Sequence, residues 1–251
     1  MRNSVDRTRL RDLTARELAR FEQDHPRSRE LSERAKANLL AGVPMPWMSE
    51  WAGSYPVFVA EAHGARFTDV DGREYVDLCL GDTGAMTGHA PKEAVEAIAE
   101  QAAKGITHML PTEDAAWVGA EMQRRFGLPF WQFCLTATDA NRFTIRLARA
   151  ITARPKILVF NYCYHGSVDE TILTIEDGVP GPRPGNVGAP VDPTQTTRVV
   201  EFNDVEALEE ALEHEDVACV LAEPALTNIG IVLPEPGYPD ALRRLTRDKV
   251  T

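Results

Sequence analysis

The sequence predicts an α/β protein whose mostly parallel sheet carries helices on both faces. From residue 130 onward, short apolar runs alternate with amphipathic segments, a pattern typical of strands joined by helical crossovers. The clearest runs are KILVFNY, RVVEFN and VACVLAEPA. They are largely apolar rather than alternating, as expected for strands buried on both faces of a sheet. The length of 251 residues suffices for one large domain, or for one and a half.

Composition narrows the class of protein. The net charge is −11, from 27 basic and 38 acidic residues, which argues against a surface for nucleic acid or anionic lipid. No run approaches the roughly 20 apolar residues that a membrane span needs. The N-terminus is charged and lacks the apolar core of a secretory signal. The four cysteines show no C-x-x-C spacing, so we expect buried, reduced thiols in a cytoplasmic protein.

The N-terminal part predicts two helices, an irregular segment and a hairpin. Residues 8–24 and 28–40 have helical periodicity, and Thr14 is the expected N-cap of the first helix. The irregular segment contains Trp47, whose indole either covers a core edge or lines the mouth of a pocket. The run ARFTDVDGREYVDL predicts a hairpin, with Asp71-Gly72 in a type I′ turn.

A glycine cluster follows the hairpin. Gly81, Gly84 and Gly88 lie within eight residues, and such glycines allow the backbone to approach a ligand or another chain closely. A plain loop fits the same pattern. Pro91 and Thr112 then open two helices, the second with acidic residues in its first turn.

The C-terminal part predicts the alternating elements of the sheet. A Pro/Gly-rich stretch interrupts the alternation and is expected to be a loop, and Asn203 is the expected cap of the following helix. The expected elements are a strand at 131–136, a helix at 139–152, a strand at 156–162, a short helix at 167–173, a loop at 179–194, a strand at 198–203, a helix from 204, a strand at 217–225 and a helix at 238–247.

Small residues follow the first of these apolar runs. Thr136, Ala137 and Thr138 stand between a strand-like run and a helix, where free backbone N–H groups and the helix dipole favour an anion such as phosphate. The threonine hydroxyls can donate to phosphate oxygens as well. An ordinary N-cap, with Thr or Asp as the capping residue, is the alternative interpretation of this turn.

Two further strand ends carry side chains suited to a planar heterocycle. Tyr164 can stack on such a ring, with His165 beside it and a glycine that permits a sharp turn. Glu223 and Asn228 follow the last apolar run, and Asn228 can bond a ring hydroxyl. Ligands of open parallel sheets bind at the carboxyl ends of strands, so we expect these three ends to form one site. The sequence contains no zinc motif, P-loop or nucleophile elbow.

These motifs resemble those of class III (ω-type) aminotransferases, which are pyridoxal-phosphate-dependent enzymes of fold type I. The resemblance is strongest to the branch that contains glutamate-1-semialdehyde aminomutase. It covers about residues 41–247 and rests on GARFTDVDGREYVDL, TGHAP, TATDAN, ARAITARPKILVFNYCYHG and AEPALTNIGIVLPEPGY. It implies pyridoxal 5′-phosphate as cofactor, an amino donor with a keto or aldehyde acceptor as substrates, and a homodimer.

The resemblance also assigns expected roles to residues near the phosphate and the ring. Ala137 and Thr138 take the phosphate-binding positions, with Thr136 beside them. Tyr164 is expected to stack on the pyridine ring, and His165 to line the pocket.

Further roles follow for the ring hydroxyl and the substrate. Glu223 and Asn228 are expected near the hydroxyl side of the ring. Gly84, in the glycine cluster, is expected on the substrate side, close to the partner subunit. Trp47 is also expected on the substrate side, in the segment on which substrate choice depends.

The sequence departs from the family pattern in ways that bear on activity. Thr-Ala-Thr-Asp replaces the family's Ser-Gly-Thr-Glu, which places a Cβ where glycine allows close phosphate approach. The aspartate that pairs with the pyridine nitrogen is not found. None of the lysines stands in the sequence context of the family's Schiff-base lysine. The lysines of the chain are Lys36, Lys92, Lys104, Lys156 and Lys249.

We therefore expect the N-terminal part of such an enzyme, inactive by itself. Residues 1–70 are predicted to form a helical segment with the start of the hairpin, and residues 71–251 an incomplete large cofactor-binding domain without the small C-terminal domain. A non-catalytic scaffold of the same fold, binding a phosphorylated ligand or a partner chain, is the alternative.

Overall fold

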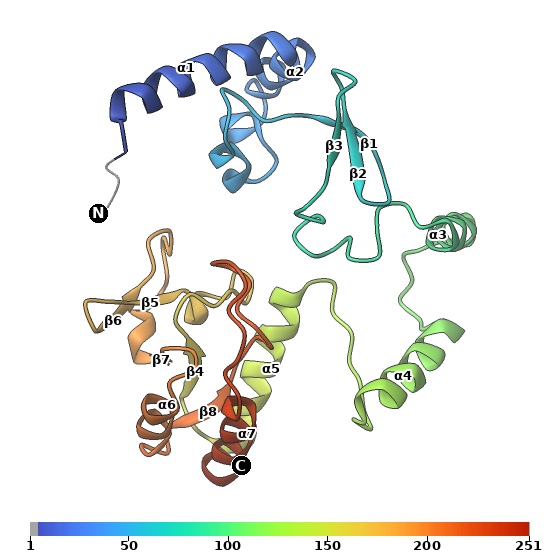
Figure 1. The fold of residues 1–251 in the computed structure, drawn as a ribbon. Helices are drawn as coiled ribbons and strands as arrows, with labels where there is room; N and C mark the ends of the chain where they lie inside the picture. Colours follow the sequence, from blue (N-terminus) through green and yellow to red (C-terminus); the bar gives the residue numbers. More distant parts are fainter. Residues whose placement is uncertain (1–4, 251) are drawn as a thin grey trace. The chain divides into compact units, whose positions relative to one another are not determined.

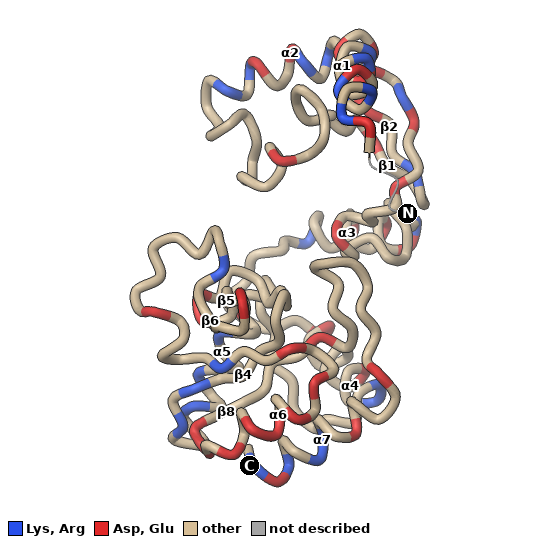
Figure 2. Tube along the Cα trace, turned by 60° about the vertical axis from the view of Figure 1, so that its left-hand side comes forward, with Lys and Arg blue, Asp and Glu red and all other residues tan. Residues whose placement is uncertain are grey.

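The computed structural model describes residues 5–250 and divides into two compact units. The N-terminal unit is Met1–Pro111 and the C-terminal unit is Thr112–Thr251, and each is described by itself (Figure 1). The predicted division after residue 70 concerns domains of the complete family fold and stays a prediction. In both units acidic and basic residues are interspersed along the helices (Figure 2). Within residues 5–250, no helix combines the length and apolar character needed to cross a bilayer.

The N-terminal unit begins with two helices and continues into a small antiparallel sheet. Asp6 caps α1 by accepting from the amides of Thr8 and Arg9, both at 3.0 Å. Thr14 lies inside this helix and donates to the carbonyl of Leu10, so its prediction as N-cap is wrong. The elements are α1 (Arg7–Asp24), α2 (Pro26–Ala35), η1 (Leu40–Gly42), η2 (Pro46–Glu50), β1 (Val59–His63), β2 (Arg66–Asp69), β3 (Glu74–Val76) and α3 (Lys92–Lys104), with sheet order β1-β2-β3.

The predicted hairpin is confirmed as β2 and β3, but its turn is not of type I′. Asp69 N–H donates to the carbonyl of Arg73, which closes a three-residue loop. Gly72 has φ +81°, whereas Asp71 keeps a negative φ. The Asp71 carboxylate instead accepts from the first amides of α2. This long-range contact selects the longer loop.

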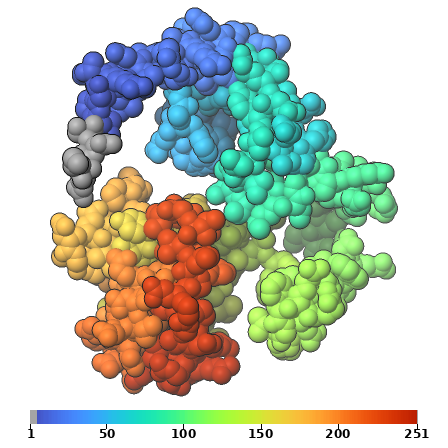
Figure 3. Space-filling view, in the orientation of Figure 1, coloured from blue at the N-terminus to red at the C-terminus, as the bar shows by residue number. Residues whose placement is uncertain are grey.

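The C-terminal unit is built on a three-stranded parallel sheet of order β7-β4-β8, which confirms the parallel α/β prediction. Residues 157–160 of the central strand β4 are fully buried. Residues from β7 onward form one continuous mass in Figure 3, orange to red. The elements are α4 (Glu113–Phe126), α5 (Ala137–Thr152), β4 (Lys156–Phe160), η3 (Asp169–Thr171), β5 (Leu173–Glu176), β6 (Val179–Pro182), η4 (Pro193–Gln195), β7 (Thr197–Val200), α6 (Val205–Leu212), β8 (Val217–Val220) and α7 (Tyr238–Lys249).

Three local predictions in this unit are wrong. Residues 131–136 form no strand, because no described strand lies beside them to complete a ladder, and Leu135 is fully exposed. Asp204, not Asn203, caps α6. The predicted short helix at 167–173 is reduced to the single turn η3.

The Pro/Gly stretch also differs from its prediction, since it begins with a strand rather than a loop. Asp177 (φ +50°) and Gly178 (φ +79°) form a two-residue turn between β5 and β6 with positive φ at both central positions. The Asp-Gly signal for a tight hairpin was therefore present at 177–178, where the proline content of the next residues concealed it.

Candidate functional site

The candidate site lies where β4 and β8 end, and a buried asparagine organises the first of these ends. Asn161 follows β4 directly and is 2% exposed. Its Nδ2 donates to Glu201 Oε1 at 2.7 Å, and its Oδ1 accepts from Thr174 Oγ1 and Ile175 N, both at 3.1 Å. These bonds tie the chain leaving β4 to the end of β7 and to β5, so the next residues start from a defined position. Asn161 is not among the predicted site residues, although a polar residue directly after an apolar run is a recognisable signal.

Glu223 and Asn228 bind the backbone that leaves β4. Glu223 Oε1 accepts from the amide of Tyr164 at 3.0 Å, and its Oε2 accepts from both the amide and the hydroxyl of Thr227. Asn228 Nδ2 donates to the carbonyl of Tyr162 at 3.3 Å. The structure thus brings the predicted residues of two strand ends together. Tyr164 is 58% exposed, so its ring is accessible for stacking.

The first turn of α5 is joined to the same loop. Thr138 Oγ1 accepts from Ser167 N at 3.1 Å, and Asn141 Nδ2 donates to the carbonyl of His165 at 3.0 Å. Gly166 has φ +80°, and a Cβ built there would lie 2.2 Å from Thr138 Oγ1. Only glycine fits this junction, which fixes the helix end beside the Tyr164 loop.

Thr136 is the N-cap of α5, as in the ordinary interpretation of this turn. Its Oγ1 accepts from the amide of Asp139 at 3.1 Å and donates to Asp139 Oδ2 at 2.8 Å. The amides of Ala137 and Thr138 belong to the first turn, where helix geometry provides no intrahelical acceptor. They remain suited to a phosphate, although the Asp139 carboxylate also occupies this helix end.

His165 adds a buried polar atom with no partner. The residue is 7% exposed, and within residues 5–250 its Nε2 has no hydrogen-bond partner. Burial lowers the pKa of His165, against the opposing effect of the Glu223 carboxylate. The imidazole is therefore neutral near pH 7. A neutral ring with an unused nitrogen, beside an exposed aromatic ring and a helix N-terminus, fits an aromatic phosphorylated ligand.

Comparison with known proteins decides the family. Residues 47–250 match the family model of class-III aminotransferases. This chain belongs to the class-III aminotransferase family. Glutamate-1-semialdehyde 2,1-aminomutase from Methanosphaera stadtmanae is 38% identical over 225 residues, which cover 88% of this chain and 52% of that protein. The enzyme from Methanocaldococcus jannaschii is 34% identical, with 88% and 53% covered. The class-III chain spans about half the length of these relatives.

Solved structures agree. A glutamate-1-semialdehyde-aminomutase from Pseudomonas aeruginosa has a TM-score of 0.92 and 51% identity, with 98% of this chain and 54% of that one covered. A variant of it was solved in complex with PMP. An omega-transaminase from Sphaerobacter thermophilus has a TM-score of 0.80 and 31% identity, with 89% and 53% covered. The fold of this class-III chain is accordingly that of fold-type I pyridoxal-phosphate-dependent transferases.

Two predicted substrate-side residues of the class-III chain lie in the N-terminal unit. Trp47 belongs to η2, is 48% exposed, and has its ring 6.1 Å from that of Trp51. Gly84 donates its N–H to the carbonyl of Gly81 within the glycine loop. The two units are described separately, so the role of both residues beside the strand ends stays a prediction.

The two lysines of the C-terminal unit lie at the other end of the sheet. Lys156 is the first residue of β4 and lies 3.5 Å from Asp216. At about 3.3 Å per residue, its Cα is about 13 Å from the end of that strand. Lys249 ends α7, and its carbonyl accepts from Arg154, which precedes β4. Neither lysine lies at the strand ends that carry Tyr164 and Glu223.

Proposed function

We propose that this chain provides the phosphate-facing and ring-facing side of a pyridoxal 5′-phosphate site. The complete site would serve an aminotransferase or aminomutase that moves an amino group between an amino acid or amine and a keto or aldehyde acceptor. The observation that carries the proposal is the set of contacts joining Thr138, Gly166, Tyr164 and Glu223. The family match and the PMP complex of the Pseudomonas aeruginosa relative support it.

Each residue has a physical role in this proposal. The N–H groups of Ala137 and Thr138 hold the phosphate, aided by the helix dipole. Tyr164 stacks on the ring, while Glu223 and Asn228 hold the backbone beneath it. The neutral His165 contributes its unused ring nitrogen to the pocket. Pyridoxal phosphate, when bound, supplies an electron sink for the bond that is broken at the substrate carbon.

The proposal also concerns the catalytic competence of the chain, its oligomeric state and its location. No lysine of the C-terminal unit lies at the strand ends, so we propose that residues 1–251 alone do not complete the reaction. We also propose a homodimer in a cytoplasmic setting. The apolar face of α5 supports the homodimer, because a second chain could cover it. Phe143, Leu147 and Ile151 recur every four residues on this face and are 53–82% exposed.

A non-catalytic scaffold for a phosphorylated ligand is the second candidate. The placement of Lys156 and Lys249 at the far end of the sheet favours it. The two candidates differ in what they recognise. A scaffold that recognises only the phosphate group would bind inorganic phosphate and pyridoxamine phosphate with similar affinity. A cofactor site would bind pyridoxamine phosphate more tightly, because the ring adds contacts.

Titration with pyridoxamine phosphate tests the proposal, because this amine cannot react with lysine. We expect saturable binding at one site per chain, tighter than that of inorganic phosphate. Tyr164→Ala should weaken it about tenfold, since a stacked aromatic pair is lost. Tyr162→Ala is the matched control, because its ring is also exposed and only its backbone is bonded. Absence of saturable binding, or equal losses in both variants, would contradict the proposal.

A further inference from the structure

A pocket in the C-terminal unit lies outside the residues proposed for the cofactor. It has a volume of about 330 Å³ and lies between the middle of α5, the turn η3 and the chain around η4. This volume is at the lower end of the range in which proteins bind small organic molecules. Ser167 joins the pocket to the phosphate turn, because its N–H donates to Thr138 and its carbonyl accepts from Arg142 Nη2 at 3.0 Å. The pocket is therefore a neighbour of the cofactor site and not a part of it.

Apolar side chains line much of the pocket. Ile145 of α5 and Val168, which precedes η3, are 2% and 0% exposed and belong to the core. Val191 lines the pocket from the Pro/Gly-rich stretch. The chain beside it is held in shape by Asp192, whose carboxylate accepts from the amide and the hydroxyl of Thr194 at the start of η4. The pocket is thus preformed and suits an aliphatic group.

Charged side chains of both signs line the same pocket. Arg142 and Arg146 lie one turn apart on α5, and Asp169 and Glu170 belong to η3. Glu170 is already paired, because its Oε1 accepts from Arg149 Nη1 at 2.9 Å. Within residues 5–250, the exposed side chains of Arg146 and Asp169 form no hydrogen bond and no ion pair. The pocket therefore holds one guanidinium and one carboxylate that these residues leave unpaired.

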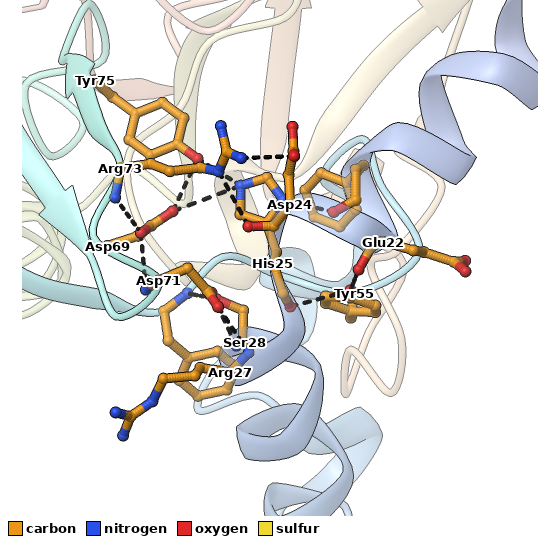
Figure 4. A network of polar contacts seen from close by, with 12 residues as sticks. Glu22, Asp24, His25, Arg27, Ser28, Tyr55, Asp69, Asp71, Arg73 and Tyr75 are labelled. Atoms are coloured by element: carbon orange, nitrogen blue, oxygen red, sulfur yellow. Dashed lines mark hydrogen bonds and ion pairs between the residues drawn. The ribbon is translucent and has the colours of Figure 1, made fainter.

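Opposite charges around a second hollow of the chain pair directly with one another. In the N-terminal unit, Arg73 lies 2.6 Å from Asp24, and both residues line that hollow (Figure 4). Arg20, which also lines it, lies 3.6 Å from the same carboxylate. Arg146 and Asp169, in contrast, are not within ion-pair distance although they line one pocket. A ligand between them can satisfy both charges.

The chemistry of the lining residues defines such a ligand. An arginine fork matches a carboxylate, because two N–H donors meet two oxygens. An aspartate carboxylate in turn accepts from an ammonium group. Aliphatic α-amino acids combine a carboxylate, an ammonium and an apolar body. A phosphate ester fits less well, because it brings about two negative charges to a pocket that already contains Asp169 and Glu170.

We propose that this pocket binds a free α-amino acid with an aliphatic side chain, at a site separate from the proposed cofactor contacts. Arg146 holds the carboxylate, with Arg142 beside it, and Asp169 holds the ammonium. The aliphatic side chain packs between Ile145 and Val191. The site goes beyond the proposed amino transfer, because none of its residues contacts the strand ends assigned to the cofactor.

NMR titration of the 251-residue chain with L-leucine locates the ligand. Leucine should shift the methyl signals of Ile145 and Val191 in a saturable manner, with a Kd of about 1 mM. The ring signals of Tyr164 should stay in place, and saturating pyridoxamine phosphate should not abolish the leucine shifts. Two analogues test the charges, since 4-methylpentanoate lacks the ammonium and 3-methylbutan-1-amine lacks the carboxylate. Each should bind about tenfold more weakly than leucine.

Charge-removing variants test the two residues separately. Arg146→Gln and Asp169→Asn should each weaken leucine about tenfold, because one charged contact is lost. Asp169→Asn should not weaken 4-methylpentanoate, and Arg146→Gln should not weaken 3-methylbutan-1-amine, since these ligands lack the matching charge. Arg243→Gln and Asp240→Asn are the matched controls, because both residues are exposed charges of α7. They should bind leucine like the unaltered chain.

Three results would overturn the proposal. The first is the absence of saturation at leucine concentrations about tenfold above the expected Kd. The second is a set of leucine shifts confined to the Tyr164 ring, which would place the amino acid at the cofactor site. The third is a loss of affinity that is equal in the pocket variants and in the α7 controls. Binding of pyridoxamine phosphate is measured independently, so leucine binding without it would contradict only the proposed function.

Discussion

Single residues at the ends of β4 and β8 position backbone rather than reach outward. Glu223 and Asn228 both bind main-chain groups of residues 162–164, and Thr138 accepts from a main-chain amide. Their side chains are therefore partly used within the fold. Among residues 5–250, the groups without such a role are the Tyr164 ring, the Nε2 of His165 and the first amides of α5. In the proposed cofactor site, these are the groups that would contact the ligand.

Gly166→Ala should destabilise the chain more than Gly178→Ala. Both glycines have nearly the same φ, +80° and +79°, so both variants incur about 1–2 kcal/mol of left-handed strain. At Gly166 the new methyl also meets Thr138 Oγ1, whereas nothing lies within 4 Å at Gly178. Overpacking of this kind costs about 1–3 kcal/mol more. Urea midpoints of the two variants measure the difference, and equal midpoints would mean that the junction is not rigid.

The four free cysteines should react in a defined order. Cys163 is buried, and burial raises its pKa to about 11, so little thiolate is present at pH 8. Cys79 and Cys134 are exposed, which corrects the expectation that the thiols are buried. Brief iodoacetamide treatment followed by peptide mass spectrometry should label these two first. Early labelling of Cys163 would show that the end of β4 opens readily.

At the scale of elements, periodicity and capping predicted most helices and the parallel sheet. Helices α3, α4 and α5 begin within about two residues of their predicted positions, because Pro91, Thr112 and Thr136 provide local start signals. The predictions failed where residues distant in the sequence determine the local structure. Asp71 turns toward α2 rather than into a tight turn, and residues 131–136 have no described neighbour with which to pair.

The candidate site also has parts that local sequence patterns predict and parts that depend on distant residues. Its location at strand ends follows from the order of apolar runs, and Tyr164, Glu223 and Asn228 lie together as that order implies. Asn161 was missed because its three bonds reach residues 13 to 40 positions away. Such partners carry no local sequence signal. The parts of a site that depend on chain topology can thus be predicted before the parts that depend on packing.

Asp216→Asn should lower the free energy of unfolding in a pH-dependent way. This carboxylate lies at the end of the sheet opposite the candidate site. Asp216 accepts from Arg198 of β7 at 2.8 and 2.7 Å and lies 3.5 Å from Lys156 of β4. The Arg198 hydrogen bond lowers its pKa below 3.8, against the opposing effect of burial. The stabilisation that ionised Asp216 contributes is complete above pH 3.8, the pKa of the unfolded state. It is lost as the pH falls through the lower pKa of the folded state.

The variant should therefore lose about 1–2 kcal/mol at pH 7, and the difference from the unaltered chain should shrink as the pH falls below about 4. Urea unfolding at pH 7 and at pH 3 measures both quantities. Glu209→Gln is the matched control, because Glu209 is exposed on α6. A loss that is unchanged at low pH would show that Asp216 acts by shape and not by charge.

At the scale of the whole chain, the decisive test is covalent. Borohydride treatment in the presence of pyridoxal phosphate should attach the cofactor to no lysine in a stoichiometric, site-directed manner. Lys156 and Lys249 lie at the amino end of β4, while the proposed phosphate and ring contacts lie at its carboxyl end. Peptide mapping locates any label, and excess pyridoxamine phosphate separates the cases. Scattered surface labels should persist under that competition. A single lysine that is labelled stoichiometrically and protected by pyridoxamine phosphate would contradict the proposal, because the chain would then bring a Schiff-base lysine to the cofactor by itself.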